Sequence, residues 1–475
     1  MGFNFPILKM PTKGLLLSLA LWLLIWAGYN TYPRLDFSSP VNFFQGIRAF
    51  CPILAGFLVL ILLLKENSFS LRILKTPLGF LFLYTFFGIV ASICLSLKPF
   101  LALYWGSSYL SVLLVLYWSL IYFKSQTSFF LDLNYLFALF ITIALFCFFL
   151  RQPGALQFFI EGNFWQGRPF EGLFGLQAAQ ETLGMVGTRP TGFGRYAGVV
   201  ALFSLAKLLE KKKKIQFGWL FLFTLSYFLL IFSQGKTEIF GFILASFFIF
   251  LLKSQSKFDI FSWSFLTLSQ LVLVGILLFY LPYFYGPQLQ RMVDSGPKIA
   301  VSNKLPSTSQ PPLSTFEPIP SLSESTSPSP NVPLKEKISP AFTLGGRIKG
   351  IWPQDFRFFL KSPLIGWGFN ADWIFPQAGH AHNAILQALI QTGILGTIFF
   401  SLAFLESAYL LFKFLKKSNN LKEKETLIKI LALFIFFAVR SITQSTGAFF
   451  GADFIFLTPA LAYLSFKNAK EYSNN

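Results

Sequence analysis

Long apolar runs recur along most of the chain, and short polar segments separate them. A helix needs about 20 mostly apolar residues to cross the hydrocarbon core of a bilayer. About twelve stretches approach that length, and we predict transmembrane helices at 14–30, 47–64, 77–97, 100–123, 129–150, 191–208, 216–233, 236–252, 261–281, 392–413, 427–447 and 453–467. The pattern therefore predicts an all-α polytopic membrane protein with about 12 transmembrane helices.

Composition supports a membrane protein and explains the charge. The chain is 54% hydrophobic and only 12% charged, about half the charged share of a typical soluble domain. The net charge of +19 follows from basic residues that gather in alternate loops, such as 207–214 and 413–429. Lys and Arg concentrate in cytoplasmic loops, so we predict that both termini are cytoplasmic. The run KKKK at 211–214 is then a topology signal, and no nucleic-acid partner is expected.

The predicted helices divide the chain into three parts. Residues 1–281 carry helices one to nine, 282–391 form a large extracytoplasmic loop, and 392–475 carry the last three helices and a cytoplasmic tail. Within the loop, 306–333 is dominated by Pro, Ser and Thr and predicts a disordered insertion. Order is expected to resume over 345–391, which we interpret as the catalytic part.

The ordered part of the loop begins with an amphipathic pattern. Apolar residues at helical spacing are Ile348, Ile351, Trp352, Phe356, Phe359 and Leu360. Polar residues between them are Arg347, Gln354, Asp355, Arg357 and Lys361. The pattern predicts a helix that lies on the outer membrane surface and contacts membrane lipids.

Five cations fall at the predicted outer ends of helices or inside one of them. They are Arg189, Arg195, Lys236, Arg347 and Arg440. Ionisable groups at membrane depth are costly and usually functional, and guanidinium forks suit phosphate or pyrophosphate. Contact with lipid headgroups is the alternative for Arg189, Arg195 and Arg347, and snorkelling is the alternative for Lys236. Arg440 interrupts an apolar run and needs a partner or a wet cavity. The cluster favours an anionic substrate.

The chain has two histidines, and both lie in the segment QAGHAHNAILQALIQTGILG, as His380 and His382. They are candidates for structural hydrogen bonding, for metal binding or for general-base chemistry. Asp372 is the one further metal ligand nearby, so no metal or cofactor is expected. An imidazole titrates near neutral pH, which suits a base. We favour His382 over His380 because Asn383 can orient it, although Asn383 also suits an N-cap.

Several segments resemble the O-antigen ligase and polymerase superfamily. The loop segments are GRIKGIWPQDF, SPLIGWGF and HAHNAILQALIQTGILG, and a helix containing VRSITQ follows them. Earlier in the chain, TRPTGFGRYAGVVAL and SQGK occupy corresponding places, so the resemblance extends from Arg189 to the C-terminus. It implies a metal-independent glycosyltransferase in the bacterial inner membrane, with its active site facing the periplasm.

The resemblance also implies substrates and residue roles. The donor would be a glycan on undecaprenyl pyrophosphate, and the acceptor a hydroxyl of lipid A core in ligases, of another glycan in polymerases or of a protein in oligosaccharyltransferases. His382 matches the catalytic base, Arg347 matches one pyrophosphate ligand, and Arg189 or Arg195 matches another. Two departures are Lys236, where relatives often carry arginine, and Gln444, where an acid often follows the late arginine.

Two functions of other classes compete with glycosyl transfer. A bicarbonate-like anion transporter would place its polar groups near the bilayer midplane, whereas most of the groups above lie at the predicted outer surface. A structural partner in a surface-assembly complex would not need the histidine.

Overall fold

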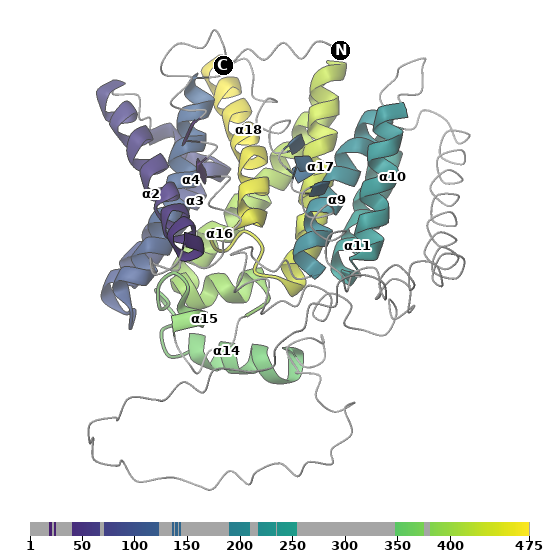
Figure 1. Cartoon of the computed structure of the whole chain (residues 1–475). Coiled ribbons are helices and arrows are strands. Elements are labelled where there is room, and N and C mark those ends of the chain that lie inside the picture. The colour runs from purple at the N-terminus through teal and green to yellow at the C-terminus, as the bar shows by residue number, and fades with distance from the viewer. Residues whose placement is uncertain are drawn as a thin grey trace, which may run out of the picture.

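The computed structural model of the chain describes residues 19–20, 23–24, 40–66, 71–122, 135–136, 138–140, 142–143, 190–209, 217–233, 235–253, 347–374 and 381–474 (Figure 1). Within these ranges every regular element is a helix or a helical turn, and there is no strand. Nine long helices pack side by side, and the short helices α14 and α15 lie at one end of the bundle, which we call the loop end.

The elements follow in chain order. They are α2 (Pro40–Glu66), the 3₁₀ turn η2 (Leu71–Lys75), α3 (Pro77–Cys94), α4 (Pro99–Tyr122), α9 (Pro190–Leu208), α10 (Phe217–Phe232), α11 (Lys236–Lys253), the π-helical turn η6 (Arg347–Ile351), α14 (Trp352–Phe359), α15 (Ala371–Ile374), α16 (Ala384–Lys417), α17 (Leu421–Thr443) and α18 (Ala452–Asn474). Proline opens α2, α3, α4 and α9, because the first turn of a helix needs no backbone N–H partner there.

The long helices coincide with nine of the predicted spans. Within the described part of the chain, four helical stretches are long and apolar enough to cross a membrane: Pro77–Cys94, Pro99–Ser119, Ala384–Lys417 and Leu421–Thr443. The all-helical membrane fold is thus confirmed in outline, while the count of twelve stays a prediction. The predicted spans 14–30, 129–150 and 261–281 lie wholly or largely outside the described residues, as does the insertion 306–333.

Two hydrophobic cores hold the bundle together. Helices α9, α10, α11 and α17 surround one core, which contains Tyr227 and Phe436, and helices α2, α3 and α4 line the other, which contains Tyr84 and Trp118. Helix α16 contributes to both cores along its length. Helix α18 lies between these groups and contributes to both cores, as its central place in Figure 1 shows. The first turn of α18, with Asp453, is therefore held between the two halves of the bundle.

Helix α16 is broken near its loop end. Gly393 has φ 61° and ψ −166°, a backbone conformation that a helix cannot contain. The preceding segment 363–368 fills the break: Trp367 N donates to Ile390 O and Gly368 N to Gln391 O, both at 2.8 Å. On the other side of the break, Ile394 N donates to Pro363 O at 2.8 Å. The inserted segment thus replaces helical hydrogen bonds that the break removes, and the predicted boundary at 391/392 falls at this break.

The predicted amphipathic helix forms as η6 and α14, and the burial of Asp355 differs from the prediction. Asp355, predicted on the polar side, is fully buried, whereas Phe356 and Leu360, predicted on the apolar side, are 49% and 55% exposed. The buried side packs Phe358 and Phe359 into a small core at the loop end. Asp355 lies three and four residues before Phe358 and Phe359, so it shares their buried side of α14. A position on the membrane surface stays a prediction.

Candidate functional site

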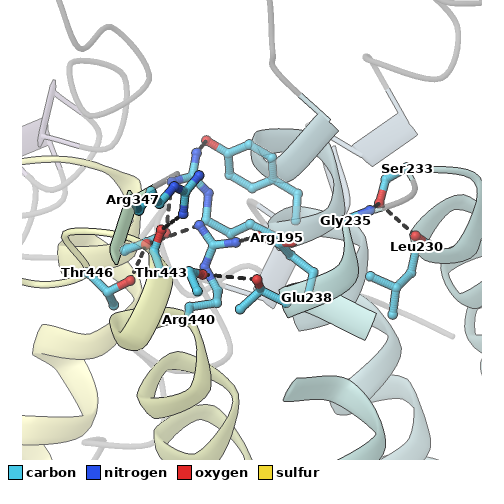
Figure 2. A network of polar contacts seen from close by, with 12 residues as sticks. Arg195, Leu230, Ser233, Gly235, Glu238, Arg347, Arg440, Thr443 and Thr446 are labelled. Atoms are coloured by element: carbon cyan, nitrogen blue, oxygen red, sulfur yellow. Dashed lines mark hydrogen bonds and ion pairs between the residues drawn. The ribbon is translucent and has the colours of Figure 1, made fainter. Parts of the chain in front are cut away.

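The last turn of α17 is where the predicted site residues meet. Residues 440–443 contact α11, α18, the turn η6 and the start of α16 through hydrogen bonds and ion pairs. Figure 2 shows Arg195, Arg347 and Arg440 at this end of α17. These segments lie far apart in the sequence, so the fold creates the site.

Two arginines and two carboxylates form a buried network beside α17. Arg440 forms ion pairs with Glu238 of α11 and, at 3.2 Å, with Asp453 of α18. Arg195 of α9 forms an ion pair with the other oxygen of Asp453 at 2.8 Å. Cations and anions therefore alternate, and the four side chains carry no net formal charge. A buried charge is tolerated when it is paired and hydrogen-bonded in this way.

The two arginines of the network differ in exposure. The side chain of Arg440 is 3% exposed, whereas that of Arg195 is 19% exposed and its guanidinium lies over the ring of Tyr196, 4.8 Å from the centroid. Two glycines make room for the network: a Cβ on Gly194 or Gly235 would press against Glu238. Arg195 can therefore meet a ligand, while Arg440 is enclosed by protein.

Arg347 reaches the same helix end from η6. Its Nη1 donates a hydrogen bond of 2.6 Å to the carbonyl oxygen of Thr443, the last residue of α17. The hydroxyl of Thr443 is 2.9 Å from that of Thr237 in the first turn of α11. The C-terminal end of a helix carries partial negative charge and unpaired carbonyls, so it favours a guanidinium.

His382 lies at the start of α16 and is tied to the same end of α17 through its neighbour. The Oδ1 atom of Asn383 accepts from Leu386 N at 3.0 Å, so Asn383 is the N-cap, and its Nδ2 donates to Ile442 O at 3.2 Å. His382 itself has φ 47°, in the left-handed region that non-glycine residues seldom adopt. Such backbone conformations persist where the surroundings impose them, often at functional sites.

The structure thus brings together five of the predicted residues: Arg195, Arg347, Arg440, His382 and Asn383. His380 and Arg189 lie outside the described residues, as does the side chain of Lys236, which is the first residue of α11. Within the described ranges no group of three or more His, Cys, Asp or Glu side chains is placed to hold a metal ion.

Glu238 and Asp453 were missed by reasoning from sequence. Each is an acidic residue inside or next to a strongly apolar run, KTEIFGFILASF and GADFIFLTP. The rule that charges at membrane depth occur in pairs would have identified them as partners for the arginines. They also bear on Gln444: the acid expected just after Arg440 is absent, and Asp453 pairs with Arg440 from the next helix.

Comparison with known proteins extends these findings. Residues 219–401, less than half of the chain, match the family model described as O-Antigen ligase. This part of the chain is therefore similar to O-antigen ligases. The resemblance predicted from the sequence is therefore confirmed, and it indicates a multi-pass membrane protein of the glycan ligase or polymerase type. The matched region includes Lys236, Glu238, Arg347 and both histidines, whereas Arg195 and Arg440 lie on either side of it. No curated protein matches the chain.

Proposed function

We propose that this protein is a metal-independent membrane glycosyltransferase. It transfers a glycan from undecaprenyl pyrophosphate to an acceptor hydroxyl, with lipid A core as the acceptor, on the periplasmic face of the bacterial inner membrane. The match to the O-antigen ligase family supports this type of reaction. Polymerisation onto another glycan and transfer to a protein side chain are the alternatives within the same chemistry.

One observation carries the proposal. Arg195, Arg347 and the segment that contains His382 come from separate parts of the chain and lie at the same end of α17. Arg195 and Arg347 are both partly exposed and are the proposed ligands of the donor pyrophosphate, together with Lys236 and Arg189. Arg440 is enclosed between Glu238 and Asp453, so we assign it to holding the network in place.

The proposed reaction needs a base and a stabilised leaving group. His382 accepts the proton of the acceptor hydroxyl while the hydroxyl oxygen forms a bond to the anomeric carbon of the donor glycan. The bond between that carbon and the pyrophosphate oxygen breaks, and its electron pair leaves with undecaprenyl pyrophosphate. Guanidinium groups stabilise the negative charge that develops there, because a fork of N–H donors matches two phosphate oxygens. The proton on His382 then passes to water, and His380 is the second candidate for this role.

The experiment is a transfer assay with purified protein, undecaprenyl-pyrophosphate glycan and lipid A core. We expect transfer by the wild type, loss of transfer in His382→Ala, and near-normal transfer in Arg357→Ala, a matched control that removes an exposed cation from α14 in the same loop. Full activity of His382→Ala would contradict the assigned base, and the absence of any transfer to lipid, glycan or protein acceptors would contradict the function.

A gel profile of surface glycolipids separates the alternatives. Cells that lack the gene should accumulate lipid-linked glycan and bare lipid A core if the protein is a ligase. Single repeat units that still reach the core would indicate a polymerase. Re-expression of the wild type should restore the profile and that of His382→Ala should not.

A further inference from the structure

The turn between α17 and α18 connects the part of the site around His382 and Asn383 to the network that contains Arg195 and Arg440. Ser445 donates to Oε1 of Gln387, one helical turn beyond Asn383, at 3.2 Å. Thr446 donates to Oδ2 of Asp453 at 2.9 Å. Residues 445–448 are all buried, and Gly447 has φ 77°, so this turn cannot rely on helical hydrogen bonds for its carbonyl groups.

Two tyrosines from the N-terminal part of the chain supply those hydrogen bonds. The hydroxyl of Tyr109 in α4 donates to the carbonyl of Gly447 at 2.8 Å, and that of Tyr84 in α3 donates to the carbonyl of Ala448 at 2.6 Å. A hydroxyl has one proton, so Tyr84 must accept from its other neighbour, the side-chain amide nitrogen of Gln391 at 3.0 Å, and the same nitrogen also donates to the carbonyl of Ala448 at 2.8 Å. Both tyrosines are fully buried.

From this arrangement we infer that Tyr84 and Tyr109 are positioning residues for the donor-binding site. The two hydroxyls fix the turn, the turn places Thr446 on Asp453, and Asp453 holds Arg195 and Arg440. A buried carbonyl without its donor would make the turn shift, because an unmet hydrogen bond inside a protein is costly. The inference rests on the proposed function, since it assumes that Arg195 binds the pyrophosphate.

The inference gives the N-terminal helices a part in the site. Helices α3 and α4 lie outside residues 219–401, the part that matches the O-antigen ligase family. Their hydroxyl groups nevertheless reach the two carbonyls that follow Thr446. Variation in α3 and α4 would then alter how tightly the donor is held without changing any residue that touches it.

The test measures the binding of undecaprenyl pyrophosphate to purified full-length protein. We expect Tyr109→Phe to raise the Kd about two- to tenfold, the range for one buried hydrogen bond, because the ring is kept and the hydroxyl alone is lost. Tyr84→Phe should have a smaller effect in the same direction, because Gln391 still donates to the carbonyl of Ala448. The matched control is Tyr135→Phe, which also removes a buried hydroxyl hydrogen bond, 3.2 Å to Ser204, but belongs to the other core and should leave the Kd unchanged.

A double variant shows whether the tyrosine acts through the network. Asp453→Asn alone should weaken binding, and Tyr109→Phe should add little on that background. Wild-type affinity in both tyrosine variants, an equal loss in Tyr135→Phe, or an additive loss in the double variant would each overturn the inference. If the wild type itself does not bind undecaprenyl pyrophosphate, the proposed function fails instead.

Discussion

Replacing Glu238 by glutamine would test whether the arginine network is a buried ion-pair system. Glu238 is 0% exposed and its partner Arg440 is 3% exposed at the side chain, so the variant leaves a buried guanidinium with Asp453 shared between two cations. Removal of one partner from a buried pair typically costs about 3–5 kcal/mol. We therefore expect Glu238→Gln to lower the free energy of unfolding by about 3 kcal/mol.

The assay is unfolding of the purified protein in mixed micelles by titration with SDS. Glu471→Gln is the matched control, because Glu471 pairs with Lys413 and Lys417 at the opposite end of the bundle while its side chain stays 24% exposed. Exposed pairs contribute about 0–1 kcal/mol, so the control should lose little.

A charge-free replacement sharpens the argument. The double variant Glu238→Leu with Arg440→Met keeps the Arg195–Asp453 pair and removes both members of the inner pair, so it should recover most of the lost stability. A loss below about 1 kcal/mol in Glu238→Gln, or a double variant less stable than the single one, would refute the reasoning that this pair is desolvated and mutually dependent.

Three further predictions follow from the loop end. Gly393→Ala places a side chain at φ 61° against the neighbouring backbone, so we expect a loss of at least about 1–2 kcal/mol by the same titration, whereas Gly350→Ala, with nothing within 4 Å of its added Cβ, should change little. Asn383→Asp keeps the N-cap acceptor but loses the donor to Ile442, so transfer activity should fall while the melting temperature stays close to the wild-type value, and equal losses in both would contradict the orienting role. Arg195→Lys keeps the charge but not the fork, and it should raise the Kd for undecaprenyl pyrophosphate several-fold, while an unchanged Kd would remove Arg195 from the donor site.

The features that the sequence predicted well are local ones. A long apolar run is sufficient to predict a span, because the backbone must form a helix wherever it crosses hydrocarbon. Asn383 was recognised as an N-cap because the signal is a single residue before an apolar helix. Arg440 was singled out because a charge inside an apolar run needs a partner.

The features that the sequence did not predict depend on distant segments. The partners of Arg440 lie on other helices, so only the packing of α11 and α18 against α17 identifies Glu238 and Asp453. The segment around Gly393 resembles a continuous helix, and its break depends on the inserted residues 363–368. The burial of Asp355 depends on the packing of α14 against α16, which the hydrophobic period alone does not reveal.

The arrangement of the arginine network also constrains how the protein is made. Helix α17 carries Arg440 near its end, and Asp453 follows only after the short turn that leads into α18. If the two helices insert together as a hairpin, the cation and the anion enter the lipid as a neutral pair, which lowers the cost of inserting either charge. Helix α17 would then insert stably only after α18 has been translated.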